Sequence, residues 1–112
     1  MSAANAHRDE AVANTLRGEA VMVLAGAALR LRPSFASLVA AEAELGPLFA
    51  LVERAAGGGL MLAEMAGLLW HCLVDPPEGL TREAFCEALV AAGLAAVTPV
   101  LRVVLGQVLA GR

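Results

Sequence analysis

The chain has 112 residues and a mass of 11.4 kDa, enough for one domain with its own core and too little for two ordinary domains. Hydrophobic residues make up 59% of it, with alanine and leucine prominent, and this mixture favours helices over a strand-rich sandwich or barrel. The charged fraction of 17% and the net charge of −3 argue against intrinsic disorder, a nucleic-acid-binding surface and a polybasic membrane anchor.

The first 17 residues are small, polar and charged, without an apolar centre, so they do not resemble a secretory signal and predict a flexible N-terminal tail. The two cysteines, Cys72 and Cys86, are too few for a disulfide framework. We therefore expect a cytoplasmic protein with reduced thiols.

A membrane span is not expected, although the mean hydropathy is +0.71. The longest uncharged run, residues 88–101, is interrupted by Gly93 and by Thr98-Pro99. No uninterrupted stretch approaches the roughly 20 apolar residues that a spanning helix needs.

Two short strand-like runs, Glu19-Ala-Val-Met-Val-Leu24 and Ala27-Ala-Leu-Arg-Leu31, flank Ala25-Gly26, which predicts a β-hairpin with these two residues as the turn. The turn is not of the favoured Asn-Gly type, because Ala25 would have to adopt a positive φ. A lone hairpin is marginal in water, so its apolar face should rest on helices. The expected register pairs Ala20 with Leu31, Met22 with Leu29, and Glu19 with Arg32.

Apolar residues at helical spacing, with helix-start and helix-stop residues between them, predict the remaining elements. Ser34 and Thr81 are expected N-caps, Gly46-Pro47 a stop, and Pro99 the first residue of the last helix. The predicted helices are about 34–45, 48–56, 62–74, 81–92 and 99–110.

These elements predict an α+β fold, mostly α, in which an N-terminal β-hairpin leads a compact cluster of four to five short helices. We find no internal repeat and no domain boundary, so residues 18–112 are expected to form a single domain after the tail.

Glu42 lies seven positions after Phe35, within about 20° of it on a helical wheel, and so falls in the apolar stripe of its helix. Glu44 falls on the expected solvent face. A buried carboxylate needs a partner, since an unpaired buried charge costs several kcal/mol. A structural ion pair with an arginine is favoured over a general base or a binding anchor; the candidate partners are Arg30, Arg32 and Arg54.

His71, Cys72 and Cys86 could suggest a metal site or a thiol nucleophile. However, His71 and Cys72 are adjacent on one helix and point about 100° apart, and no second ligand stands at a metal-binding spacing. A buried or half-buried cysteine and a surface histidine are the favoured interpretation. No metal, cofactor or catalytic residue is predicted.

The Gly57-Gly58-Gly59 run lacks the Lys-Ser/Thr sequence of a phosphate-binding loop, so it is interpreted as a hinge or turn. Met65 and Trp70 lie on the apolar stripe of the third helix, where core packing is favoured over a ligand pocket.

The last predicted helix is apolar around most of its circumference, and complete enclosure of such a helix is hard to arrange in a small domain. We therefore predict that it is partly exposed as a surface for self-association or for a partner. The predicted surface comprises Val100, Leu101, Val104, Leu105, Val108 and Leu109.

Two runs of the sequence resemble the small tail proteins of gene transfer agents and related phages, a family labelled phage tail tube protein or tail assembly chaperone. The first is Asn14-Thr-Leu-Arg-Gly-Glu19 and the second is Leu29-Arg-Leu-Arg-Pro-Ser-Phe-Ala-Ser-Leu-Val-Ala-Ala-Glu-Ala-Glu-Leu-Gly46. The similarity covers roughly residues 14–95. The residues that carry it determine the fold rather than catalyse: Arg17, Gly18, Glu19, Pro33, Ser34, Phe35, Glu42, Leu45 and Gly46.

The resemblance implies a non-enzymatic protein of tail morphogenesis that escorts the tape measure protein while tail tube subunits polymerise around it, with those two proteins as partners. A homo-oligomer is compatible with this role, and transient association with assembling particles is expected. The alternatives are a small helical adaptor that binds a partner helix and a structural tail tube component. An enzyme using Glu42 or Cys86 is disfavoured, because no further catalytic group accompanies either residue.

Overall fold

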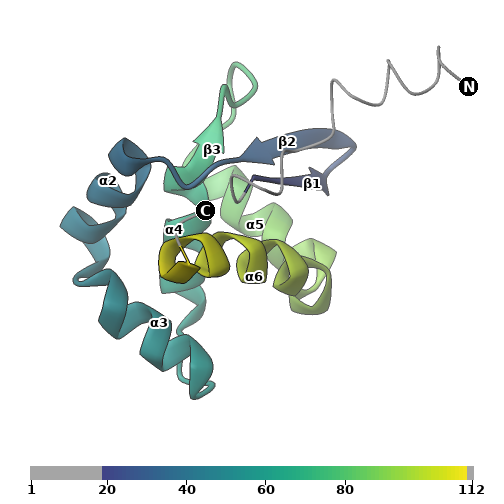
Figure 1. Ribbon diagram of the computed structural model, residues 1–112. Coiled ribbons are helices and arrows are strands. Elements are labelled where there is room, and N and C mark those ends of the chain that lie inside the picture. Colours follow the sequence, from purple (N-terminus) through teal and green to yellow (C-terminus); the bar gives the residue numbers. More distant parts are fainter. Residues whose placement is uncertain (1–18, 111–112) are drawn as a thin grey trace, which may run out of the picture.

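The computed structural model describes residues 19–110, so the predicted tail, with Arg17 and Gly18, lies outside the described residues. Two strands are followed by helices and one short further strand, which confirms the predicted α+β, mostly α, class (Figure 1). In chain order the elements are β1 (Ala20–Leu24), β2 (Ala27–Leu31), α2 (Phe35–Leu45), α3 (Leu48–Ala56), α4 (Leu62–Cys72), β3 (Leu73–Val74), α5 (Arg82–Ala92) and α6 (Leu94–Ala110).

The hairpin forms in the predicted register, with Ala20 opposite Leu31 and Met22 opposite Leu29. Both turn residues take positive φ, 50° at Ala25 and 81° at Gly26. The alanine thus accepts a conformation that usually favours glycine or asparagine, because a type I′ turn, whose twist matches that of the strands, needs positive φ at both central residues.

A third strand was not predicted. Helix α4 ends at Cys72, and the Leu73–Val74 segment that was expected to be helical pairs antiparallel with Arg30 and Leu31 of β2. The Arg32 N–H also donates to the Cys72 carbonyl at 2.7 Å. The free edge of β2 offers these two residues backbone partners outside the helix, and this long-range pairing prevails over the helical pattern.

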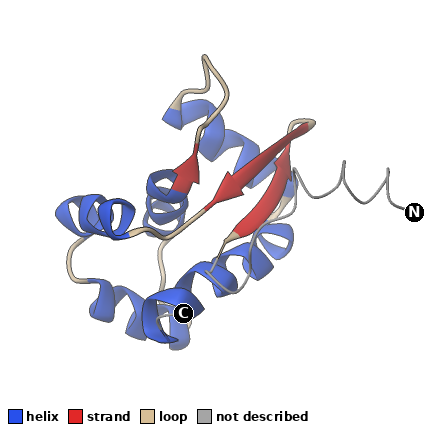
Figure 2. Ribbon diagram, turned by 45° about the horizontal axis from the view of Figure 1, so that its top comes forward, coloured by secondary structure: helices blue, strands red, loops and turns tan. Residues whose placement is uncertain are grey.

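One face of the β1-β2-β3 sheet packs on the helices, as Figure 2 shows. Helices α5 and α6 pack against β1, and α4 runs through the middle of the molecule. On the far side of α4, helix α2 packs along it and α3 continues from α2 at the periphery (Figure 1). The largest fully buried side chains are Phe85, Leu31, Leu51, Leu68, Leu69, Leu89, Val97, Val104 and Cys72.

The predicted caps are confirmed at two helices. The Ser34 hydroxyl accepts from the Ser37 N–H at 3.1 Å, and the Thr81 hydroxyl accepts from the Ala84 N–H at 3.1 Å. The predicted stop after α2 is also confirmed, because Gly46 takes a φ of 90° and the chain then turns into α3. Local side-chain chemistry therefore sets these helix ends.

The last helix begins earlier than predicted. Gly93, with a φ of 92°, is the break, and α6 begins directly after it at Leu94, which places Pro99 inside the helix rather than at its first position. Pro99 has no N–H, so α6 lacks the backbone hydrogen bond that this residue would otherwise donate to the carbonyl four positions earlier. The Thr98 hydroxyl donates to the Leu94 carbonyl at 2.9 Å within this turn.

Among residues 19–110, no single helix is long and apolar enough to cross a bilayer. The pairs α2–α3 and α5–α6 meet the length and hydropathy criteria only when taken together, and they are bent by 79° and 116°.

Candidate functional site

Glu42 does not occupy a buried stripe. Its side chain is exposed and accepts a hydrogen bond from the Leu48 N–H, at 3.1 Å, so it caps the first turn of α3 across the Gly46-Pro47 corner. The predicted ion pair with an arginine is therefore wrong. Among the described residues, Arg54 pairs with Glu64 and Arg32 lies 3.8 Å from Glu19.

The reason lies in which side of α2 is buried. Phe35 is 85% exposed and Val39 is also exposed, whereas Ala41 is buried and Leu38 and Leu45 pack against the core. The helical wheel correctly places Glu42 beside Phe35, but that side faces solvent. Because α2 carries apolar residues around most of its circumference, periodicity alone could not select the buried side.

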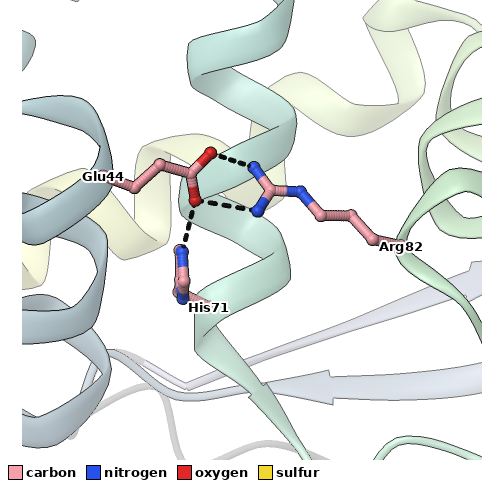
Figure 3. Close-up of polar contacts among 3 residues, drawn as sticks. All are labelled: Glu44, His71 and Arg82. Atoms are coloured by element: carbon pink, nitrogen blue, oxygen red, sulfur yellow. Dashed lines mark hydrogen bonds and ion pairs between the residues drawn. The ribbon is translucent and has the colours of Figure 1, made fainter.

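Glu44, which was expected on the solvent face of α2, is the acidic residue that contacts side chains of two other helices. Arg82, at the start of α5, donates to both of its carboxylate oxygens, with Nη1–Oε1 at 2.8 Å and Nη2–Oε2 at 2.5 Å. His71, in the last turn of α4, lies with Nε2 at 2.8 Å from Oε1. Figure 3 shows the carboxylate between the guanidinium and the imidazole. Glu44, His71 and Arg82 are called the polar clamp below.

The clamp keeps Glu44 ionised. Hydrogen bonds from Arg82, and then from His71, lower the pKa of the Glu44 carboxyl from its ordinary 4.5 to about 2. A carboxylate with so low a pKa is a weak general base at neutral pH. The arrangement therefore suits a structural connection among α2, α4 and α5.

Gly67 makes room for the clamp in the middle of α4. A Cβ atom on Gly67 would lie 2.9 Å from Nη2 of Arg82 and 3.2 Å from Cδ2 of Leu45. Both α2 and the Arg82 side chain thus cross α4 directly over this glycine. A larger residue would displace one of them.

The cysteines take the predicted structural environments. Cys72 is fully buried, and desolvation raises the pKa of its thiol to about 12, whereas Cys86 is half-buried. His71 contacts Glu44, whereas the Cys72 side chain lies in the core. Within residues 19–110 no group of three or more His, Cys, Asp or Glu side chains could hold a metal ion.

The glycine run forms a turn, as predicted. Gly57 closes α3 through a bond from its N–H to the Glu53 carbonyl at 3.1 Å, and Gly58 takes a φ of 79°. The chain then enters α4, where the Glu64 carboxylate accepts from the Met61 N–H at 3.0 Å and also pairs with Arg54. Glu64 thus supplies the N-terminal cap that was not recognised in the sequence.

The apolar stripe of α4 faces the core. Trp70 packs against Phe85 with ring centroids 5.6 Å apart and an interplanar angle of 52°. Met65 is buried, but it also borders a surface groove, so the core and pocket interpretations both hold in part for this residue.

The predicted partner surface on the last helix divides between core and surface. Val100 and Val104 are buried with Val97 and are not available to a partner, which corrects that part of the prediction. The other members lie on the flank beside them, where Leu101, Leu105 and Val108 are partly buried and Leu109 is exposed. Because α6 begins at Leu94 and not at Pro99, it also includes Val97, which lies in the core.

An apolar groove of about 260 Å³ lies between this flank of α6 and the start of α4. Met61 is 66% exposed, and Leu62 and Leu94 are also exposed, so the groove is open to solvent. This region is called the α4–α6 groove below. It is lined by Ala55, Gly58, Leu60, Met61, Leu62, Met65, Leu94, Thr98 and Leu101.

Comparison with known proteins supplies the family. The family model described as "Phage tail tube protein, GTA-gp10" matches residues 17–111, which include all of the described helices and strands. No curated protein and no solved structure gives a significant match. The resemblance carried by the Arg17-Gly18-Glu19 start and the run ending at Gly46 is thereby confirmed, and the chain belongs to this family of gene transfer agent and phage tail proteins.

Proposed function

We propose that this chain is a non-enzymatic tail assembly chaperone, which binds the tape measure protein by apolar contacts in the cytoplasm before the tail is complete. The family match supports a role in a phage-like tail. The observation that carries the finer proposal is the α4–α6 groove, an apolar surface bordered by exposed side chains in a domain that already has its own core.

The groove suits an amphipathic helix. Leu94, Leu101 and Val108 are seven positions apart on α6 and so form one line along that side of the helix, as in helix-in-groove recognition. Met61 and Met65 border the opposite wall, and the flexible thioether side chain adapts to varied apolar partners. A long helical protein could be held at several such sites, which adds avidity to weak individual contacts.

Co-expression with the tape measure protein of the same gene cluster tests this proposal. The wild-type chain should copurify with it and increase its soluble yield. The double variant Met61→Glu/Leu94→Glu should abolish copurification, because it places two charges in the groove without changing a buried residue. Phe35→Glu and Val90→Glu are matched controls, since both residues are exposed and neither lines the groove. Equal copurification by the groove variant would overturn the proposal.

A structural tail tube component is the second candidate, because the family description itself reads tail tube protein. In that role the purified chain should polymerise into tubes of tail diameter, visible by negative-stain electron microscopy. Gene order separates both roles from a helical adaptor without a particle function. A tail tube gene upstream and a long tape measure gene downstream support a role in the tail.

A further inference from the structure

Strand β1 is the outer strand of the sheet. The strand order is β1-β2-β3, so among the described residues β1 has a neighbouring strand on one side only (Figure 2). Its sequence, Ala-Val-Met-Val-Leu, contains no charge and no proline, and it pairs with β2 without a bulge. Natural edge strands usually carry a charged residue, a proline or a bulge, and these features prevent pairing with another chain.

The register identifies which backbone groups point away from β2. A two-residue turn makes Leu24 and Ala27 a hydrogen-bonded pair, and the pairs alternate from there along an antiparallel ladder. The N–H and C=O groups of Val21 and Val23 therefore point outward at the edge. Val23 is also 66% exposed.

We propose that this edge pairs with β1 of a second copy of the chain, antiparallel and about a two-fold axis at Met22. In this register all residues of β1 overlap, and each Val21 exchanges backbone hydrogen bonds with Val23 of the second copy. The two sheets join into one. A closed two-fold contact of this kind uses the same surface on both copies.

The side chains at the edge fit this register. On the inner face, the small Ala20 lies opposite the larger Leu24 of the second copy, and on the outer face the valines meet one another. The nearest charged side chain on the outer face of β2 is Arg30, opposite Val21. Arg30 shares its cross-sheet row with Ala28 of the second copy, so the pairing brings no like charges together. This complementarity favours a second copy over an unrelated strand.

Sedimentation velocity of the full chain over a range of concentrations tests the proposal. The wild type should dimerise as the concentration rises. Val23→Pro should weaken dimerisation by about 30-fold, because each copy loses one outward N–H donor while the bonds to β2 remain. Val23→Thr, which is also β-branched and keeps the N–H, should dimerise like the wild type. A wild type that stays monomeric at every concentration, or a Val23→Pro dimer as tight as the wild type, would overturn the proposal.

Disulfide trapping tests the register and does not depend on folding of the proline variant. An oxidised mixture of Val21→Cys and Val23→Cys chains should form a covalent dimer that neither variant forms alone and that the wild type, with Cys86, does not form. Equal crosslinking in the unmixed samples would exclude this register. Crosslinking of the cysteine variants to a different protein would show that the β1 edge binds another partner. Loss of dimerisation only in variants of the α4–α6 groove would place the dimer contact there. Either result would also contradict the proposal.

Discussion

Two halves of the molecule are held together by different interactions. On one side, α5 and α6 meet the sheet through apolar side chains with almost no exposure, such as Phe85, Leu89 and Val104. On the other side, α2 packs on α4 with the smaller apolar contribution of Ala41, Leu38 and Leu45, close over Gly67, and the polar clamp adds ion pairs to α4 and α5. Burial of apolar area is worth more than half-exposed ion pairs. The α5–α6 half should therefore dominate global stability, whereas the clamp fixes where α2 lies.

The largest effect should come from the apolar half. Phe85→Ala should lower the free energy of unfolding by about 3–5 kcal/mol, because it removes a fully buried ring that packs on Trp70. Urea denaturation followed by far-UV circular dichroism measures it. Phe35→Ala removes the same ring from an exposed position and should change stability by less than about 0.5 kcal/mol. Similar losses for the two variants would contradict the burial assigned to them.

Gly67→Ala tests the close approach in the polar half. Alanine gains up to about 1 kcal/mol in helix propensity, but its Cβ would push against Arg82 and Leu45, which costs about 1–3 kcal/mol. We expect a net loss of about 1 kcal/mol in thermal or urea unfolding. In an Arg82→Ala background one of the two clashes is absent, so the loss should shrink. An equal loss in both backgrounds would show that Arg82 does not approach Gly67.

The clamp should weaken in acid. Because the pKa of Glu44 is about 2 in the folded chain and ordinarily 4.5, its stabilising contribution is present above pH 4.5 and is lost as the pH falls towards 2. Solvent screening limits that contribution to about 0.5–1 kcal/mol, since the Glu44 side chain is 39% exposed. Glu44→Gln should remove this part of the acid sensitivity, as measured by urea midpoints between pH 2 and 6. A variant with the wild-type pH profile would rule the clamp out.

The smallest expected effect is at Glu42. Glu42→Gln keeps an acceptor for the Leu48 N–H and removes only the charge near the start of α3, so the loss should be about 0.3 kcal/mol. Glu42→Ala removes the acceptor as well and should cost more. A large loss of unfolding free energy in the Gln variant would support the buried ion pair predicted from the sequence and contradict the contact with the Leu48 N–H.

The parts of the fold that local chemistry determines could be predicted from the sequence. The hairpin register follows from the placement of the two-residue turn at Ala25-Gly26, and Ser34 and Thr81 cap the helices that they precede. The short strand Leu73–Val74 could not be predicted, because its partner β2 lies about 40 residues earlier in the chain. Pairings this distant leave no periodic signal.

The polar clamp was missed for the same reason. Glu44 is 27 residues from His71 and 38 from Arg82, and nothing in their local sequence joins them. The apolar pattern of α2 also gave the wrong buried side, since Phe35 and Val39 are as apolar as Leu38 and Leu45 but face solvent. Gly67, a glycine inside a strongly periodic helix, was the one available signal for a close approach at this place.

The contrast between the two cysteines gives the molecule a built-in reporter. Cys72, with its thiol pKa of about 12 and full burial, should react with an alkylating reagent only when the core opens, whereas half-buried Cys86 should react from the folded state. The lag between the first and the second adduct in a mass spectrum therefore times the opening of α4. The native chain can thus report, without any substitution, whether a bound partner slows that opening.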